Sequence, residues 1–133
     1  MASIHKDVAL DAPAADVWSA VRDFGALHTR LVPGFVLETK LDGDARIVSF
    51  ANGTAAREVL VDCDDAQQRL VYAVTSERVA QHSASVQVIP DGEERCRLVW
   101  IVDVLPHAIA GYMAAQMDEA AKAMQRAFPG RSA

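Results

Sequence analysis

Apolar and polar residues alternate with a period of two through the middle of the chain, from Phe35 to Val104. Successive side chains of a strand point to opposite faces of a sheet, so this spacing predicts strands. Six strands fit the pattern: Val36 to Leu41, Arg46 to Ala51, Ala56 to Asp62, Arg69 to Val74, Gln81 to Ile89 and Arg95 to Val104. The segments between them are Asp42-Gly43-Asp44, Asn52-Gly53, Asp64-Asp65, Ser76-Glu77 and Pro90-Asp91-Gly92, the residue types of tight hairpins. Connections this short predict antiparallel neighbours.

Helical patterns precede and follow these strands in the sequence. A further strand is predicted from Ile4 to Leu10, after which Asp11 is expected to cap a helix that has Pro13 in its first turn. A second short helix is predicted from Phe24 to Leu31, and a long one from Ala108 to Phe128. The chain is therefore expected to form an α+β fold.

The long helix has one face without charge. At about 100° per residue this face carries Ile109, Met113, Met117, Ala120, Met124 and Phe128, whereas Asp118, Lys122, Gln125 and Arg126 lie opposite. Such a face must pack against a large apolar surface, and the sheet is the obvious partner. The methionines could also form a flexible surface against a ligand, although ordinary core filling explains them equally.

Charge and composition exclude several classes of partner. The chain has 18 acidic and 13 basic residues, for a net charge of -5, and the basic residues are scattered. Nucleic acid is therefore not an expected partner. No apolar run reaches the roughly 20 residues of a membrane span, so a cytoplasmic protein without integral membrane association is expected. Neither Cys63 and Cys96 nor the four histidines show a metal-ligand spacing, so no metal or cofactor is predicted.

Several short motifs carry a family resemblance. The segment Arg57 to Asp62 is followed by Asp64-Asp65 and Leu70-Val71-Tyr72, and later by His82 to Val86, Leu98-Val99-Trp100 and Asp103 to Pro106. Together with the order of elements, these motifs resemble the START-like, pollen-allergen-like (SRPBCC) superfamily and its bacterial polyketide cyclase/dehydrase families. The resemblance implies a helix-grip fold, in which a seven-stranded curved antiparallel sheet surrounds the long C-terminal helix. It covers nearly the whole chain and implies one domain over residues 1–133.

The resemblance also implies a function class. In this superfamily a cavity between sheet and terminal helix holds a small hydrophobic ligand, such as a lipid, a polyketide or another apolar metabolite. One alternative is a cyclase/dehydratase-like enzyme that uses Glu58 and His82 for proton transfer, so enzymatic activity stays open. Another is a protein-interaction module with no ligand. The expected partner is a small apolar molecule, and the protein is expected to be a monomer or a homodimer.

Glu58 and His82 are the candidate catalytic residues. Periodicity does not decide which way Glu58 points, because the opposite parity of its strand also carries valines. The distantly similar plant abscisic-acid receptors, aligned on Asp64-Asp65, imply that Glu58 and His82 both face the ligand. A surface glutamate paired with Arg57 or Arg69 is the alternative. An inward Glu58 would need a hydrogen-bond donor, for which His82, Tyr72 or a water could serve.

The predicted ligand-binding set combines these two residues with apolar and aromatic neighbours. His82 shares its parity with Ala84, Val86 and Val88, which supports an inward position from the pattern alone. The full set is Glu58, Leu60, Tyr72, His82, Ala84, Trp100, Met113, Met117 and Met124.

Overall fold

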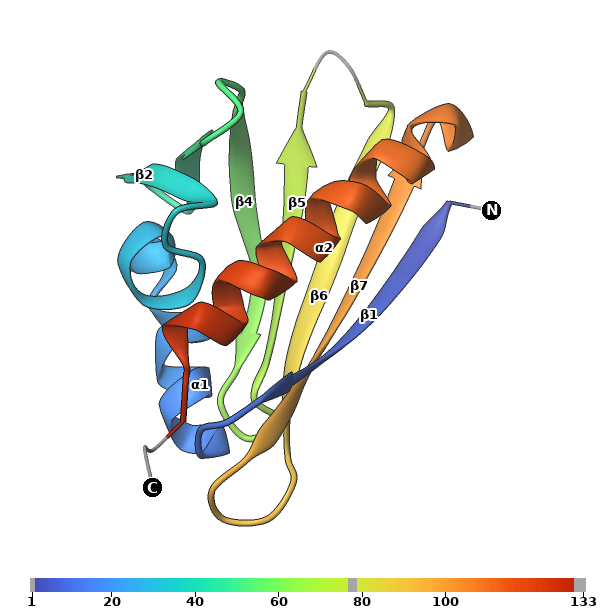
Figure 1. Ribbon diagram of the computed structural model, residues 1–133. Helices are drawn as coiled ribbons and strands as arrows, with labels where there is room; N and C mark the ends of the chain where they lie inside the picture. The colour runs from blue at the N-terminus through green and yellow to red at the C-terminus, as the bar shows by residue number, and fades with distance from the viewer. Residues whose placement is uncertain (1, 77–78, 131–133) are drawn as a thin grey trace.

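The computed structural model describes residues 2–76 and 79–130, and the strands and helices follow the predicted order (Figure 1). The elements are β1 (Ser3–Leu10), α1 (Ala14–Arg22), η1 (Phe24–Ala26), η2 (Leu27–Leu31), β2 (Val36–Asp42), β3 (Ala45–Phe50), β4 (Ala55–Asp64), β5 (Arg69–Thr75), β6 (Gln81–Pro90), β7 (Cys96–Leu105), η3 (His107–Ile109) and α2 (Ala110–Ala127). Glu77, part of the predicted turn Ser76-Glu77, lies outside the described residues.

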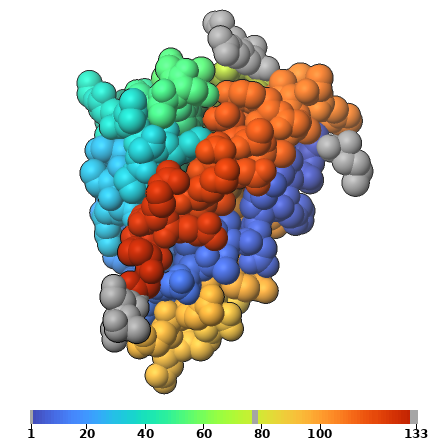
Figure 2. All heavy atoms as spheres, in the orientation of Figure 1, coloured from blue at the N-terminus to red at the C-terminus, as the bar shows by residue number. Residues whose placement is uncertain are grey.

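Over the described residues the strands form one seven-stranded antiparallel sheet in the order β1-β7-β6-β5-β4-β3-β2. Each strand from β2 to β7 pairs with its neighbour in sequence, as the short connections predicted, and β1 closes the order by pairing with β7. The sheet curves, and α2 crosses it diagonally (Figure 1). Figure 2 shows α2 as a continuous band over this face, between β1 and the segments before β4. The predicted helix-grip fold is confirmed.

The uncharged face of α2 is the buried one. Met117, Ala120, Ala123 and Met124 are each at most 3% exposed, and Met113 and Phe128 pack against the same core. Lys122, on the predicted opposite face, is exposed and pairs with Glu119. The helix therefore contributes its methionines to the interior. No helix in the described part of the chain is long and apolar enough to cross a membrane.

One local prediction was wrong, and two helices differ in detail from the predicted ones. Asp11 does not cap α1: Pro13 occupies the N-cap position, and the Asp11 carboxylate instead lies 3.0 Å from Nε of Arg95. The segment from Phe24 to Leu31 is helical as predicted, but it is a 3₁₀ turn followed by a π-helical turn, and it lies against α1 and β2. The last helix begins at Ala110, two residues later than predicted, after the 3₁₀ turn η3.

A bulge in β4 determines which of its side chains face α2. The register with β5 shifts between Leu60 and Asp62, so Val61 has no partner in the ladder and is 61% exposed. On one side of the bulge Leu60 lies opposite Tyr72, and on the other Cys63 lies opposite the buried Leu70. The extra residue reverses the parity of the strand. Glu58, which precedes the bulge, therefore faces the interior.

Candidate ligand-binding site

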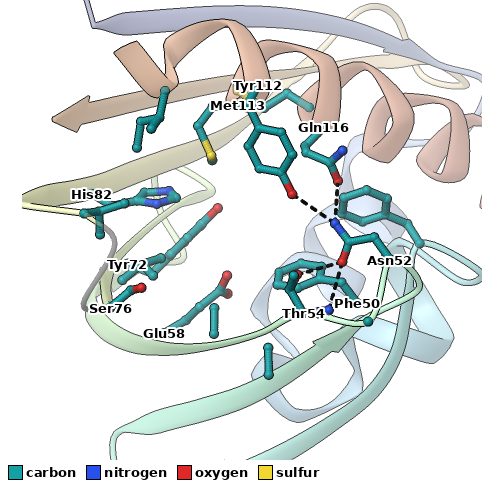
Figure 3. A pocket seen from close by; sticks show the side chains of 18 of the residues that line it. Phe50, Asn52, Thr54, Glu58, Tyr72, Ser76, His82, Tyr112, Met113 and Gln116 are labelled. Carbon is teal, nitrogen blue, oxygen red and sulfur yellow. Dashed lines mark hydrogen bonds between the residues drawn. The ribbon is translucent and has the colours of Figure 1, made fainter. Parts of the chain in front are cut away.

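A cavity of about 630 Å³ lies between the first half of α2 and the sheet (Figure 3). Its walls come from strands β3 to β7, the β3–β4 turn, η3 and α2, together with Phe35 before β2 and with Ser76 and Val79 between β5 and β6. Most of the lining is apolar or aromatic, with a few polar side chains among it. The lining residues are Phe35, Phe50, Asn52, Gly53, Thr54, Ala55, Ala56, Glu58, Tyr72, Val74, Ser76, Val79, His82, Trp100, Ile109, Tyr112, Met113, Gln116 and Met117.

Six residues of the predicted set line this cavity: Glu58, Tyr72, His82, Trp100, Met113 and Met117. The other three do not. Ala84 and Met124 are 4% and 3% exposed and belong to the solid core, and Leu60 packs against that core beside the bulge. They are absent from the lining because the cavity occupies only the part of the sheet under the start of α2. Farther along the helix, side chains fill the space. Ligand binding by the six stays a prediction.

Glu58 is buried and paired with a residue that the sequence interpretation missed. Nε and Nη2 of Arg46 both lie 2.8 Å from Oε1 of Glu58, and the two residues are 5% and 6% exposed. They stand directly opposite each other on β3 and β4, so their side chains share the inner face. Glu58 has the donor that an inward position requires, but Arg46 supplies it rather than the suggested His82 or Tyr72. The alternative of a surface pair with Arg57 or Arg69 was wrong.

Arg46 is held behind Glu58 by two aromatic rings. Its guanidinium carbon lies 4.0 Å from the centre of the Phe24 ring and 5.5 Å from the centre of the Tyr72 ring. Nη1 also donates to the carbonyl oxygen of Phe24 at 3.3 Å. These contacts stabilise a cation that has been removed from water. Arg46 itself does not line the cavity, whereas Glu58 does.

Tyr72 and Trp100 form the aromatic part of the cavity wall. Nε1 of Trp100 donates to the hydroxyl oxygen of Tyr72 at 3.3 Å. Burial raises the pKa of Tyr72 far above its ordinary value; the charge of Glu58 raises it further and that of Arg46 opposes this. The phenol therefore keeps its proton at neutral pH.

His82 stands on β6 with its side chain toward the cavity, close to Met113 in the view of Figure 3. Burial lowers the pKa of His82 below its ordinary value of 6.5. Its imidazole is consequently uncharged near neutral pH. It can offer one N–H donor and one nitrogen acceptor to a molecule in the cavity.

The lowered pKa of His82 predicts a loss of stability in acid. As pH falls from about 7.5 to about 5.5, the unfolded chain takes up the proton before the folded chain does, so the free energy of unfolding decreases. His82→Gln, which cannot take up this proton, should lose less over the same interval. Urea titrations of both proteins at the two pH values measure the difference. Equal losses in the two proteins would contradict the assignment.

A group of hydrogen bonds joins the β3–β4 turn to α2 at the rim of the cavity. Asn52 Nδ2 donates to Oη of Tyr112 at 3.0 Å and to Oε1 of Gln116 at 3.4 Å (Figure 3). Asn52 Oδ1 accepts from the backbone N–H of Thr54 at 3.0 Å and from its hydroxyl at 2.7 Å, which orients the amide. We call Asn52, Tyr112 and Gln116 the rim contact. The sequence interpretation missed it, since it depends on where the turn meets the helix.

Among residues 2–76 and 79–130, no group of three or more histidine, cysteine or carboxylate side chains is placed to hold a metal ion. Cys63 and Cys96 are free thiols, and burial raises the pKa of both.

The sheet wrapped on a terminal helix, with a cavity between them, defines a helix-grip protein. Residues 1–130 match the family described as "Polyketide cyclase / dehydrase and lipid transport", and the chain belongs to that family. No curated protein matches the chain.

Solved structures agree on the fold. An uncharacterized protein from Bacillus thuringiensis is 19% identical, with a TM-score of 0.86 and coverage of 96% of this chain and 99% of that one. A START superfamily protein from Mycobacterium smegmatis is 14% identical, with a TM-score of 0.79 and coverage of 96% and 97%. Norcoclaurine synthase from Thalictrum flavum, solved in complex with dopamine and hydroxybenzaldehyde, is 20% identical, with a TM-score of 0.64 and coverage of 98% and 88%. At these identities the likeness concerns the fold.

Proposed function

We propose that the protein binds a small, mainly apolar molecule in the cavity between α2 and the sheet. The observation that carries this proposal is the cavity itself. Its volume of about 630 Å³ falls within the range of small-molecule sites, roughly 300–1,000 Å³. A core that only stabilised the fold would be close-packed, because voids forfeit dispersion contacts.

The lining fits such a ligand. Phe35 and Phe50 meet edge to face, with ring centres 5.6 Å apart, and together with Trp100 they offer large apolar surfaces. Met113 and Met117 can adapt to an irregular shape. The few polar groups on the wall, Glu58 and His82 among them, would orient the molecule. The family description mentions lipid transport, and the related synthase was solved with small molecules bound, which supports a ligand-binding role.

Native mass spectrometry of the purified protein tests the proposal. We expect a second species, heavier than the 14.3 kDa chain by the mass of one small molecule, that disappears on denaturation. Organic extraction of the same sample should recover that molecule. Only the mass of the bare chain, together with no binding of apolar fluorescent probes, would contradict the proposal.

The rim contact predicts an effect on how fast a ligand leaves. Replacing Tyr112 by Phe and Gln116 by Ala removes both acceptors of Asn52 but keeps the Asn52–Thr54 turn. Each of these exposed hydrogen bonds is worth about 0.5 kcal/mol, the lower end of the usual range, so losing both should make ligand dissociation about five-fold faster. Stopped-flow displacement of a bound fluorescent probe measures this rate.

Gln125→Ala provides the control for this pair of substitutions. Gln125 lies on the same helix and donates to the carbonyl oxygen of Ala9 at 3.4 Å, away from the cavity lining. Its replacement should leave the dissociation rate unchanged. Equal rates in the double variant and the wild type would show that the rim contact does not limit release.

A further inference from the structure

The two carboxylate oxygens of Glu58 have different surroundings. Both nitrogens of Arg46 bind Oε1, and within the described residues Oε2 receives no hydrogen bond. The side chain of Glu58 is 8% exposed and lines the cavity. Figure 3 shows its carboxyl group pointing into the space beneath Tyr112 and Asn52. An accessible carboxylate oxygen in a largely apolar cavity can accept a hydrogen bond from a ligand's donor, and a hydrogen bond to a charged group is worth about 1.5–3 kcal/mol.

The ion pair is one-sided as seen from the cavity. Arg46 does not line it and is covered by the rings of Phe24 and Tyr72. A molecule in the cavity can therefore contact the Glu58 carboxylate, whereas it is separated from the Arg46 guanidinium. A second carboxylate placed there would face like charge in a medium of low polarity, which is unfavourable.

A hydroxyl donor stands on the same wall. Tyr72 uses its oxygen to accept from Trp100, and no acceptor for its O–H group occurs in the described part of the chain. Tyr72 lies opposite Leu60 on β4, next to Val74, which lies opposite Glu58. The cavity thus offers an acceptor at Glu58 Oε2 and a donor at Tyr72 Oη, within an otherwise apolar lining.

From these contacts we propose that the cavity selects uncharged apolar molecules that carry a hydroxyl group and rejects carboxylates of the same size. The inference rests on the proposed ligand-binding function and specifies its ligand class. The hydroxyl would donate to Oε2 of Glu58, and its oxygen or a neighbouring carbonyl could accept from Tyr72. A pure hydrocarbon would fit the lining but leave Oε2 without a donor.

Three fluorescent probes with one ring system test this selection: pyrene, 1-pyrenemethanol and 1-pyrenecarboxylate. Each is titrated against the full chain after co-purified molecules have been removed. A hydrogen bond to a charged acceptor predicts that 1-pyrenemethanol binds about tenfold more tightly than pyrene. The carboxylate should bind at least about tenfold more weakly than the alcohol.

Two double variants show whether Glu58 is the cause. Replacing Arg46 and Glu58 together by Met removes the acceptor without leaving an unpaired charge, so the affinity ratio of alcohol to pyrene should fall to about one. The control changes the exposed pair on β4 and β2, Arg57→Gln with Asp42→Asn, where Nε and Oδ2 lie 3.6 Å apart. It should keep the wild-type ratio.

The outcomes separate the two proposals. Equal binding of pyrene and its alcohol by the wild type, or tightest binding of the carboxylate, would overturn the selection and leave the binding function intact. If none of the probes binds, the binding function itself fails and the selection with it. The wild-type ranking decides this even if the Met/Met variant does not fold.

Discussion

Arg46→Met should lower the free energy of unfolding by about 3–5 kcal/mol, the largest effect expected of a single substitution in this protein. The change leaves Glu58 buried with no cation, and a buried unpaired charge costs far more than the pair contributes. It also removes the contacts of the guanidinium with the Phe24 ring and carbonyl. Urea unfolding at neutral pH, followed by circular dichroism, measures the loss.

The Arg46→Met/Glu58→Met variant should recover most of that loss and lie within about 2 kcal/mol of the wild type, because apolar residues can replace a buried ion pair at little cost. Arg57→Gln changes a residue next to Glu58 on β4 and breaks its exposed pair with Asp42. It should cost less than about 1 kcal/mol of unfolding free energy. A loss below about 1 kcal/mol for Arg46→Met alone would mean that water reaches Glu58 and that the pair is not isolated as described.

Filling the cavity should reduce binding of 1-pyrenemethanol by about 30-fold or more. Ala56→Trp with Val74→Trp places two indoles in the lining, from β4 and β5. A ligand would have to displace them or accept overpacking of about 1–3 kcal/mol at each position. Fluorescence titration measures the affinity, and thermal unfolding checks that the variant is folded.

Val61→Trp is the control for this experiment. Val61 is 61% exposed at the bulge of β4 and does not line the cavity, so an indole there should leave the affinity within about twofold of the wild type. Wild-type affinity in the Ala56→Trp/Val74→Trp variant, with its fold intact, would place the ligand elsewhere on the protein. The proposed site would then be wrong.

Strand positions were predictable because the alternation is local. The strand predicted from Arg46 to Ala51 is observed as Ala45–Phe50, and the one predicted from Gln81 to Ile89 as Gln81–Pro90. Helix ends were less predictable, since Asp11 pairs with Arg95, far along the chain, instead of capping α1. A cap and an ion pair compete for the same carboxylate, and only the packed chain decides between them.

The partner of Glu58 shows what reasoning strand by strand misses. Arg46 and Glu58 lie at equal distances from Asn52, the middle of the β3–β4 turn, whose ends are joined by the bond from Phe50 N–H to the Thr54 carbonyl. The turn residues in the sequence therefore indicated that Arg46 and Glu58 could pair across the hairpin. A loop one residue longer would nevertheless have moved Arg46 to the opposite face, so the pairing depends on a turn length that composition does not specify.

The sequence by itself determined the type and order of the elements, the uncharged face of α2 and the inward parity of His82. These properties follow from side-chain direction, which repeats every two residues in a strand and about every 3.6 in a helix. Only the tertiary structure decided that Glu58 faces inward beside Arg46, that Ala84 and Met124 are solid core, and that the cavity lies under the start of α2. Those outcomes depend on hairpin register, the bulge at Val61 and the line along which the helix crosses the sheet, and a one-dimensional pattern contains none of the three.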